Sequence, residues 1–135
     1  MTQNIKLAYS IVYPFPSNYK WSEFLLEGIY IFLTYKQQRK IGDKVFTLYT
    51  PIYVGQAQNI GPELLRHYHS SQNHKLRAFF KEKPPDIYVV YAPVKGEIAR
   101  KYVEAKLINI YLSRGFELFN QQVPEPPPLF EINVF

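Results

Sequence analysis

The chain contains no cysteine among its 135 residues. Disulfide bonds, thiolate metal sites and cysteine nucleophiles are therefore excluded, although small domains without cysteine occur in every redox compartment. Long uninterrupted apolar runs are also missing, and Pro14 and Pro16 interrupt the N-terminal segment. We therefore expect a soluble protein with neither a secretion signal nor a membrane span. A cytoplasmic location is the default expectation.

Several signatures of other function classes are absent. The sequence has no glycine-rich phosphate loop, no dinucleotide-binding fingerprint and no nucleophile elbow. His67, His69 and His74 follow one another closely, but alternate helix positions diverge and no nearby aspartate completes a ligand set. A zinc site is therefore not expected.

The charge balance is basic. Sixteen Lys and Arg face eleven Asp and Glu, which leaves a formal charge of +5 and favours an anionic partner without naming it. Lys75, Arg77, Arg100 and Lys101 are the candidate phosphate contacts on two expected helices. The alternative is that these charges belong to an ordinary solvated face.

The expected fold is a single α+β domain over residues 1–135, since this length supports one compact core. Apolar and aromatic runs predict strands at 28–35 and 45–54, joined by an exposed turn at 37–44 into an antiparallel hairpin. Pro51 is expected at a bulge or on an edge strand. A third strand is predicted at 87–91.

Three helices complete the predicted order β-β-α-α-β-α. The first begins at Pro62 and the second covers 73–80, while the third lies between Gly96 and Gly115. The apolar positions of the third helix recur at helical spacing and are expected to face the core: Ile98, Tyr102, Ala105, Ile108 and Leu112. We thus expect a small antiparallel three-stranded sheet flanked by helices.

Each strand of the expected hairpin carries one short motif of three residues. Gly28-Ile29-Tyr30 lies on the first, and Tyr53-Val54-Gly55 follows on the second, with Glu104 later inside the amphipathic run. This ordered set resembles the GIY-YIG nuclease superfamily. The stretch 51–57 is particularly similar to its restriction-endonuclease branch, in which a long insertion also separates the two motif strands. The resemblance covers residues 27–121, and leaves an N-terminal extension (1–26) and a proline-rich, extended C-terminal tail (122–135).

The resemblance implies a DNA endonuclease that uses one Mg²⁺ or Mn²⁺ ion. Tyr30 and Tyr53 match the motif tyrosines, of which one helps to activate water and the other orients water or phosphate. Glu104 matches the glutamate that holds the ion, and Asn120 matches the closing asparagine.

The catalytic arginine is the point at which this chain departs from the family. By counting from Gly55, its position falls on Glu63, and Arg66 comes about one helical turn later. His67 keeps the spacing of the histidine that often follows the arginine. Either Arg66 takes the role, or the arginine is lost and the domain is a non-cleaving nucleic-acid-binding or protein-interaction module.

The residues taken singly also permit different interpretations. Tyr30 and Tyr53 could be core aromatics of a sheet, and Glu104 could be a solvated residue that pairs with Arg100 or Lys101. The basic charge could serve an unrelated acidic partner. The oligomeric state is open, with a homodimer on palindromic DNA as one alternative.

Overall fold

The computed structural model describes residues 3–82, 86–120 and 130–133. The described residues form a four-stranded antiparallel sheet in the order β2-β5-β3-β4 and a separate parallel pair of β1 and β6. In chain order the elements are β1 (Gln3–Lys6), β2 (Tyr13–Pro14), the 3-10 helix η1 (Trp21–Glu23), β3 (Gly28–Ile41), β4 (Lys44–Ala57), α1 (Ile60–Ser70), α2 (His74–Lys81), β5 (Ile87–Pro93), α3 (Glu97–Ser113) and β6 (Phe130–Asn133).

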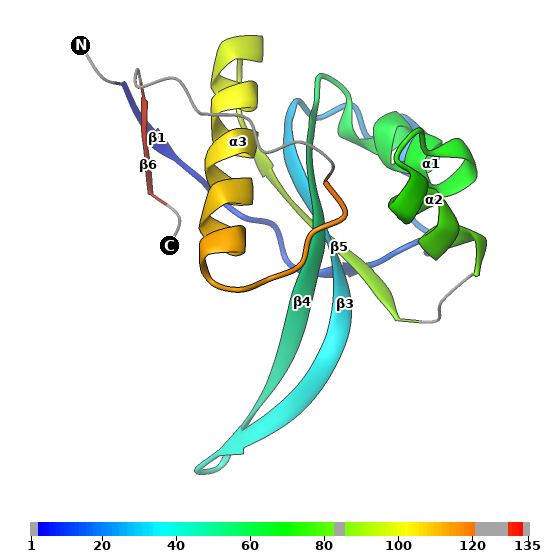
Figure 1. Ribbon diagram of the computed structural model, residues 1–135, viewed down its shortest axis with the longest axis vertical. Helices are drawn as coiled ribbons and strands as arrows, with labels where there is room; N and C mark the ends of the chain where they lie inside the picture. Colours follow the sequence, from blue (N-terminus) through cyan, green and yellow to red (C-terminus); the bar gives the residue numbers. More distant parts are fainter. Residues whose placement is uncertain (1–2, 83–85, 121–129, 134–135) are drawn as a thin grey trace.

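The main sheet lies between α3 on one face and the pair α1 and α2 on the other (Figure 1). Successive side chains of a strand point to opposite faces, so β3 serves two cores. Ile29 and Ile31 pack with Val103 of α3, whereas Tyr30 and Phe32 pack in the core that α1 and α2 cover. This double burial is what the unbroken apolar run at the start of β3 indicates.

The α+β class is confirmed, but the predicted three-stranded sheet is wrong, because β2 adds a fourth strand to the edge. Tyr13 pairs with Val89 and Pro14 with Tyr88 of β5. This strand comes from residues 1–26, the predicted N-terminal extension. Trp21 from the same segment is buried in the core beside α1, which draws the N-terminal chain onto the domain.

The hairpin of β3 and β4 is longer than expected. The predicted turn at 37–44 is wrong, because the strands continue to a two-residue turn in which Gly42 has φ 61°. Pairing of β3 with β5 ends at Thr34, so residues 35–47 project from the body as a two-stranded arm (Figure 1). Both faces of these strands carry a mixture of polar and apolar residues, so the sequence does not show the alternation that predicts a strand.

The expectation for Pro51 is confirmed. It lies on the edge strand β4, beside a register shift that leaves Ile52 as an extra residue opposite Phe32 and Leu33. An edge position tolerates a residue without an amide donor.

The helices follow the predictions with local differences. α1 begins at Ile60 rather than Pro62, and the amides of Ile60 and Gly61 donate to the carbonyls of Leu26 and Phe24, which lie between η1 and β3. α3 lies between Gly96 and Gly115 as expected. Of its predicted core positions, Ile98 and Leu112 are exposed because both occupy terminal turns of the helix.

The two outermost described segments lie side by side. β6 runs parallel to β1, with Gln3 opposite Phe130, and both lie near α3 (Figure 1). The proline-rich run at 124–128, the core of the predicted tail, lies outside the described residues. Within the described part of the chain, no helix combines the length and apolar character needed to cross a membrane.

Candidate active site

A buried hydrogen-bond chain links β3 to α1. The Tyr30 hydroxyl lies 2.8 Å from His67 Nε2, and His67 Nδ1 lies 2.9 Å from Ser71 Oγ. Tyr30 and His67 are only 1% and 3% exposed. Ser71 follows His67 by four residues, so the helical repeat places both on one face. Sequence analysis missed Ser71, although this spacing after His67 was the available signal.

His67 is a neutral imidazole at neutral pH. Burial and the nearby Arg66 together lower its pKa to about 4, against the opposing effect of Glu63. A neutral ring carries one N–H donor and one acceptor nitrogen. With its proton on Nδ1, the ring donates to Ser71 and accepts the Tyr30 hydroxyl proton on Nε2. The ring is thus placed to take a proton from the phenol.

Tyr53 lies against the same pair. Its ring centroid is 5.0 Å from that of His67 and 6.3 Å from that of Tyr30, and the two tyrosine rings are nearly parallel. Burial raises the pKa of Tyr53 to about 12 and that of Tyr30 well above its usual value. Both phenols are therefore protonated hydrogen-bond donors in the resting protein.

Close packing explains why glycine is required at both motif positions, Gly28 and Gly55. A Cβ on Gly55 would stand 2.3 Å from the hydroxyl oxygen of Tyr30, and a Cβ on Gly28 would stand 2.1 Å from the carbonyl oxygen of Ala92. Neither position has room for any side chain. Gly55 thus lets the Tyr30 ring lie directly on the backbone of β4.

Glu104 belongs to α3, on the opposite face of the sheet, and reaches the site around the edge of β4. Its carboxylate accepts a hydrogen bond from the backbone amide of Gln56. Its charge contributes to the raised pKa of both Tyr30 and Tyr53. Burial raises the pKa of Glu104 itself to about 7, against opposing effects of Lys101 and the Gln56 amide.

The outer edge of β4 is closed by the segment after α3. The Asn120 side chain donates to the carbonyl of Val54 at 2.8 Å and accepts from its amide at 3.0 Å. The Phe119 amide donates to the carbonyl of Ile52 at 2.7 Å. Asn120 therefore holds the strand between Tyr53 and Gly55 in place.

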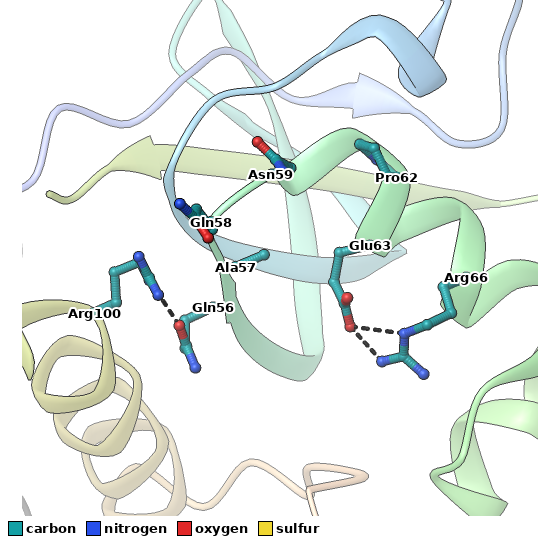
Figure 2. Close-up of a pocket in the computed structure, with 8 residues that line it drawn as sticks. All are labelled: Gln56, Ala57, Gln58, Asn59, Pro62, Glu63, Arg66 and Arg100. Carbon is teal, nitrogen blue, oxygen red and sulfur yellow. Dashed lines mark hydrogen bonds and ion pairs between the residues drawn. The ribbon is translucent and has the colours of Figure 1, made fainter. Parts of the chain in front are cut away.

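Glu63 and Arg66 form an ion pair at the rim of the site. Arg66 Nε lies 3.1 Å from Glu63 Oε1, and its terminal nitrogen lies 3.5 Å from His67 Nε2. Both residues line a pocket of about 450 Å³, with Arg100 and Gln56 across from them (Figure 2). The candidate arginine is therefore beside the buried histidine, but Glu63 neutralises part of its charge.

The four predicted phosphate contacts do not form one stripe, because α2 and α3 cover opposite faces of the sheet (Figure 1). Lys75 and Arg77 are exposed on α2. Lys101 pairs with Glu97 at 2.8 Å. Arg100 is only 9% exposed and lines the pocket. It forms an ion pair with Glu27 and donates a 2.8 Å hydrogen bond to Gln56 Oε1.

Glu104 is the carboxylate that would hold the Mg²⁺ or Mn²⁺ ion that the motif resemblance implies. The described residues contain no group of three or more His, Cys, Asp or Glu that could enclose an ion. Mg²⁺ commonly binds through one or two carboxylates and completes its shell with water and substrate phosphate. Burial raises the pKa of Glu104 to about 7 although Lys101 opposes this, so a metal ion would supply positive charge that the protein does not fully provide.

We expect metal affinity to depend on pH through Glu104. A cation binds the ionised carboxylate, which is the minor form below its pKa of about 7. Mn²⁺ affinity should therefore rise about tenfold per pH unit up to that value and level off above it. Calorimetric titration between pH 5.5 and 8.5 measures this directly. If the Mn²⁺ affinity does not depend on pH, or is unchanged in Glu104→Gln, the Glu104 carboxylate is not a metal ligand.

Comparisons of the chain with protein-family models, with curated proteins and with solved structures find no match. What the site can do is therefore inferred from the chemistry of its own residues and from the motif resemblance.

Proposed function

We propose that the chain is a metal-dependent DNA endonuclease that hydrolyses phosphodiester bonds at a GIY-YIG-type site. The observation that carries the proposal is the 2.8 Å hydrogen bond between the buried Tyr30 hydroxyl and the neutral His67. Support comes from Tyr53 beside this pair and from Glu104, whose charge acts on both phenols. Hydrolysis needs a proton acceptor for water and positive charge on the phosphate, and these residues can supply both.

Tyr30 and His67 form a proton relay. As water attacks phosphorus, its proton passes to the Tyr30 oxygen while the Tyr30 proton passes to His67 Nε2. The phenol thereby acts as a base without existing as a phenolate, whose formation its raised pKa disfavours. The resulting imidazolium is flanked by Glu63 Oε1 at 3.4 Å, which stabilises the positive charge.

The other side chains act on the phosphate. The Tyr53 hydroxyl donates to a phosphate oxygen, and Arg66 adds positive charge at the rim. Glu104 would hold the Mg²⁺ or Mn²⁺ ion, which supplies Lewis-acid stabilisation of the leaving oxygen. These roles follow the family expectation for Tyr30, Tyr53 and Glu104 and assign the arginine role to Arg66.

The second candidate function is a non-cleaving module that binds nucleic acid or protein. One observation favours it: the Arg66 guanidinium is already engaged in an ion pair with Glu63. A phosphate must displace or share this guanidinium, and Glu63 repels phosphate. The two functions differ in whether Arg66 contributes to cleavage.

We expect Arg66→Ala to lower Mg²⁺-dependent nicking of supercoiled plasmid by about a hundredfold, because loss of one charged transition-state contact typically costs this much. The side chain is 42% exposed, so the melting temperature should hardly change. Arg114→Ala, at an exposed position outside the site, is the matched control. Wild-type protein that binds duplex DNA without nicking it, and gains activity on Glu63→Arg, would instead establish the non-cleaving module.

A further inference from the structure

The arm formed by residues 35–47 is unsupported by the rest of the sheet. Thr34 is the last residue of β3 that pairs with β5, opposite Ile87. Beyond it, β3 and β4 pair only with each other, and every residue from 35 to 47 is exposed. A two-stranded ribbon alone is marginally stable in water. This arm therefore has the properties of an element that acts in a complex.

The tip carries apolar side chains with nothing of the described domain over them. Ile41 and Val45 are each 60% exposed, and Phe46 is 45% exposed. Single exposed apolar residues are common, but a group at the end of a projecting ribbon marks an interaction surface.

The charge of the arm identifies the kind of partner. Four cations, Lys36, Arg39, Lys40 and Lys44, face one acid, Asp43, so the arm has a formal charge of 4 − 1 = +3. The whole chain has +5. Thirteen residues thus hold more than half of the net charge, which is the electrostatic pattern of a polyanion-binding element.

The dimensions of the arm fit a groove of duplex DNA. At ~3.3 Å per residue, the seven residues from Tyr35 to Ile41 span roughly 23 Å. The B-DNA major groove, about 12 Å wide, admits a two-stranded β-ribbon, whereas the major groove of duplex RNA is too narrow for side chains to read. Arg39 lies opposite Phe46, and Lys40 lies opposite Val45, so each face of the ribbon carries a cation beside an apolar residue. The cations can reach phosphates on both walls while the apolar groups meet base edges.

We propose that the arm enters the major groove of B-form DNA and holds the duplex for the site at its base. The strands that form the arm also carry Tyr30 and Tyr53, which couples groove binding to the position of the phosphate at the site. The inference takes its ligand from the proposed function. It concerns binding alone, and so it can fail or hold separately from cleavage.

The test measures binding of the full-length chain to a 24-base-pair duplex by fluorescence anisotropy in EDTA, so that cleavage does not enter. The arm variant combines Lys36→Gln, Arg39→Gln, Lys40→Gln and Lys44→Gln. The matched control combines Lys6→Gln, Lys20→Gln, Lys95→Gln and Arg114→Gln, which removes three lysines and one arginine from exposed positions outside the arm. Each protein is titrated at several salt concentrations, against duplex DNA and duplex RNA of one sequence.

We expect the arm variant to bind DNA at least tenfold more weakly at 50 mM salt, with a salt slope smaller by up to about 3.6, since each of the four lost phosphate contacts contributes about 0.9 to the slope. The control should lose less than threefold, and wild-type protein should prefer DNA to RNA at least tenfold. Equal losses in the two variants would show diffuse attraction and overturn the proposal, as would equal affinity for RNA.

Two further outcomes distinguish groove binding from cleavage and from self-association. Wild-type protein that never nicks DNA, but whose affinity depends on the arm as described, supports the groove contact and rejects only the nuclease function. A wild-type dimer that becomes monomeric when Ile41 and Phe46 are changed to serine, with DNA affinity intact, would make the arm a subunit contact and overturn the proposal. Light scattering provides that measurement.

Discussion

Replacement of Glu104 by glutamine is expected to abolish Mg²⁺-dependent nicking and, at the same time, to stabilise the metal-free protein at pH 8. The amide keeps the shape of the carboxyl group and can still accept from the Gln56 amide, but it cannot hold a cation. A loss of at least a thousandfold in rate, about 4 kcal/mol of barrier, is expected for removal of the ion from the site.

The stability effect follows from the raised pKa of Glu104. Between its ordinary value of 4.5 and the folded value of about 7, the folded chain holds a proton that the unfolded chain has lost. Folding stability therefore falls as pH rises through this window, because the buried carboxylate must ionise. Glutamine removes this penalty, so the melting temperature of the variant relative to wild type should rise between pH 4.5 and pH 8.

Two controls make this prediction specific. Saturating Mn²⁺ should raise the melting temperature of wild type at pH 8 and leave Glu104→Gln unchanged, since only the carboxylate binds the ion. Glu97→Gln, which changes a fully exposed carboxylate of the same helix, should alter neither activity nor metal response. Undiminished nicking by Glu104→Gln would reject the proposed site.

Substitution of Gly55 by alanine is expected to inactivate the protein and to destabilise it by about 3 kcal/mol, at the upper end of the usual cost of overpacking a core. The new methyl group would stand 2.3 Å from the Tyr30 hydroxyl oxygen and an equal distance from ring atom Cζ. Relief requires the ring to move. Movement of the ring breaks its hydrogen bond to His67, so the relay is lost together with the packing.

A double-mutant cycle isolates this contact. In a Tyr30→Ala background the obstructing ring is absent, and Gly55→Ala should then cost less than about 1 kcal/mol. Urea denaturation of the four proteins measures the coupling. If Gly55→Ala costs the same with and without the Tyr30 ring, the glycine is required for another reason, and the close packing of the two motifs is not its cause.

The predictable parts of the fold were those with a strong local signal. Ile29 to Leu33 form an apolar run long enough to indicate a strand buried on both faces, and Gly96 and Gly115 mark the ends of α3. β2 could not be anticipated, because a two-residue strand has no periodicity and depends on Trp21 anchoring the segment. The arm could not be anticipated because both of its faces are exposed. Its side chains therefore do not alternate between apolar and polar, and the sequence carries no strand signal there.

The candidate site divides in the same way. Motif order indicated that Tyr30, Tyr53 and Glu104 should be considered together, and the spacing after the second motif pointed to His67. Pairings of charged side chains were not visible, because the partners of Arg100, which are Glu27 and Gln56, lie 73 and 44 residues away in sequence. Such pairs depend on the three-dimensional register of α3 against the sheet.

The parallel pairing of β1 with β6 joins the earliest and latest described segments of the polypeptide. During synthesis β6 leaves the ribosome after every other described element, so this small sheet can close only once the rest of the fold has emerged. The core around Tyr30 needs no described residue beyond Phe119. The core around Tyr30 should thus form before β1 and β6 meet.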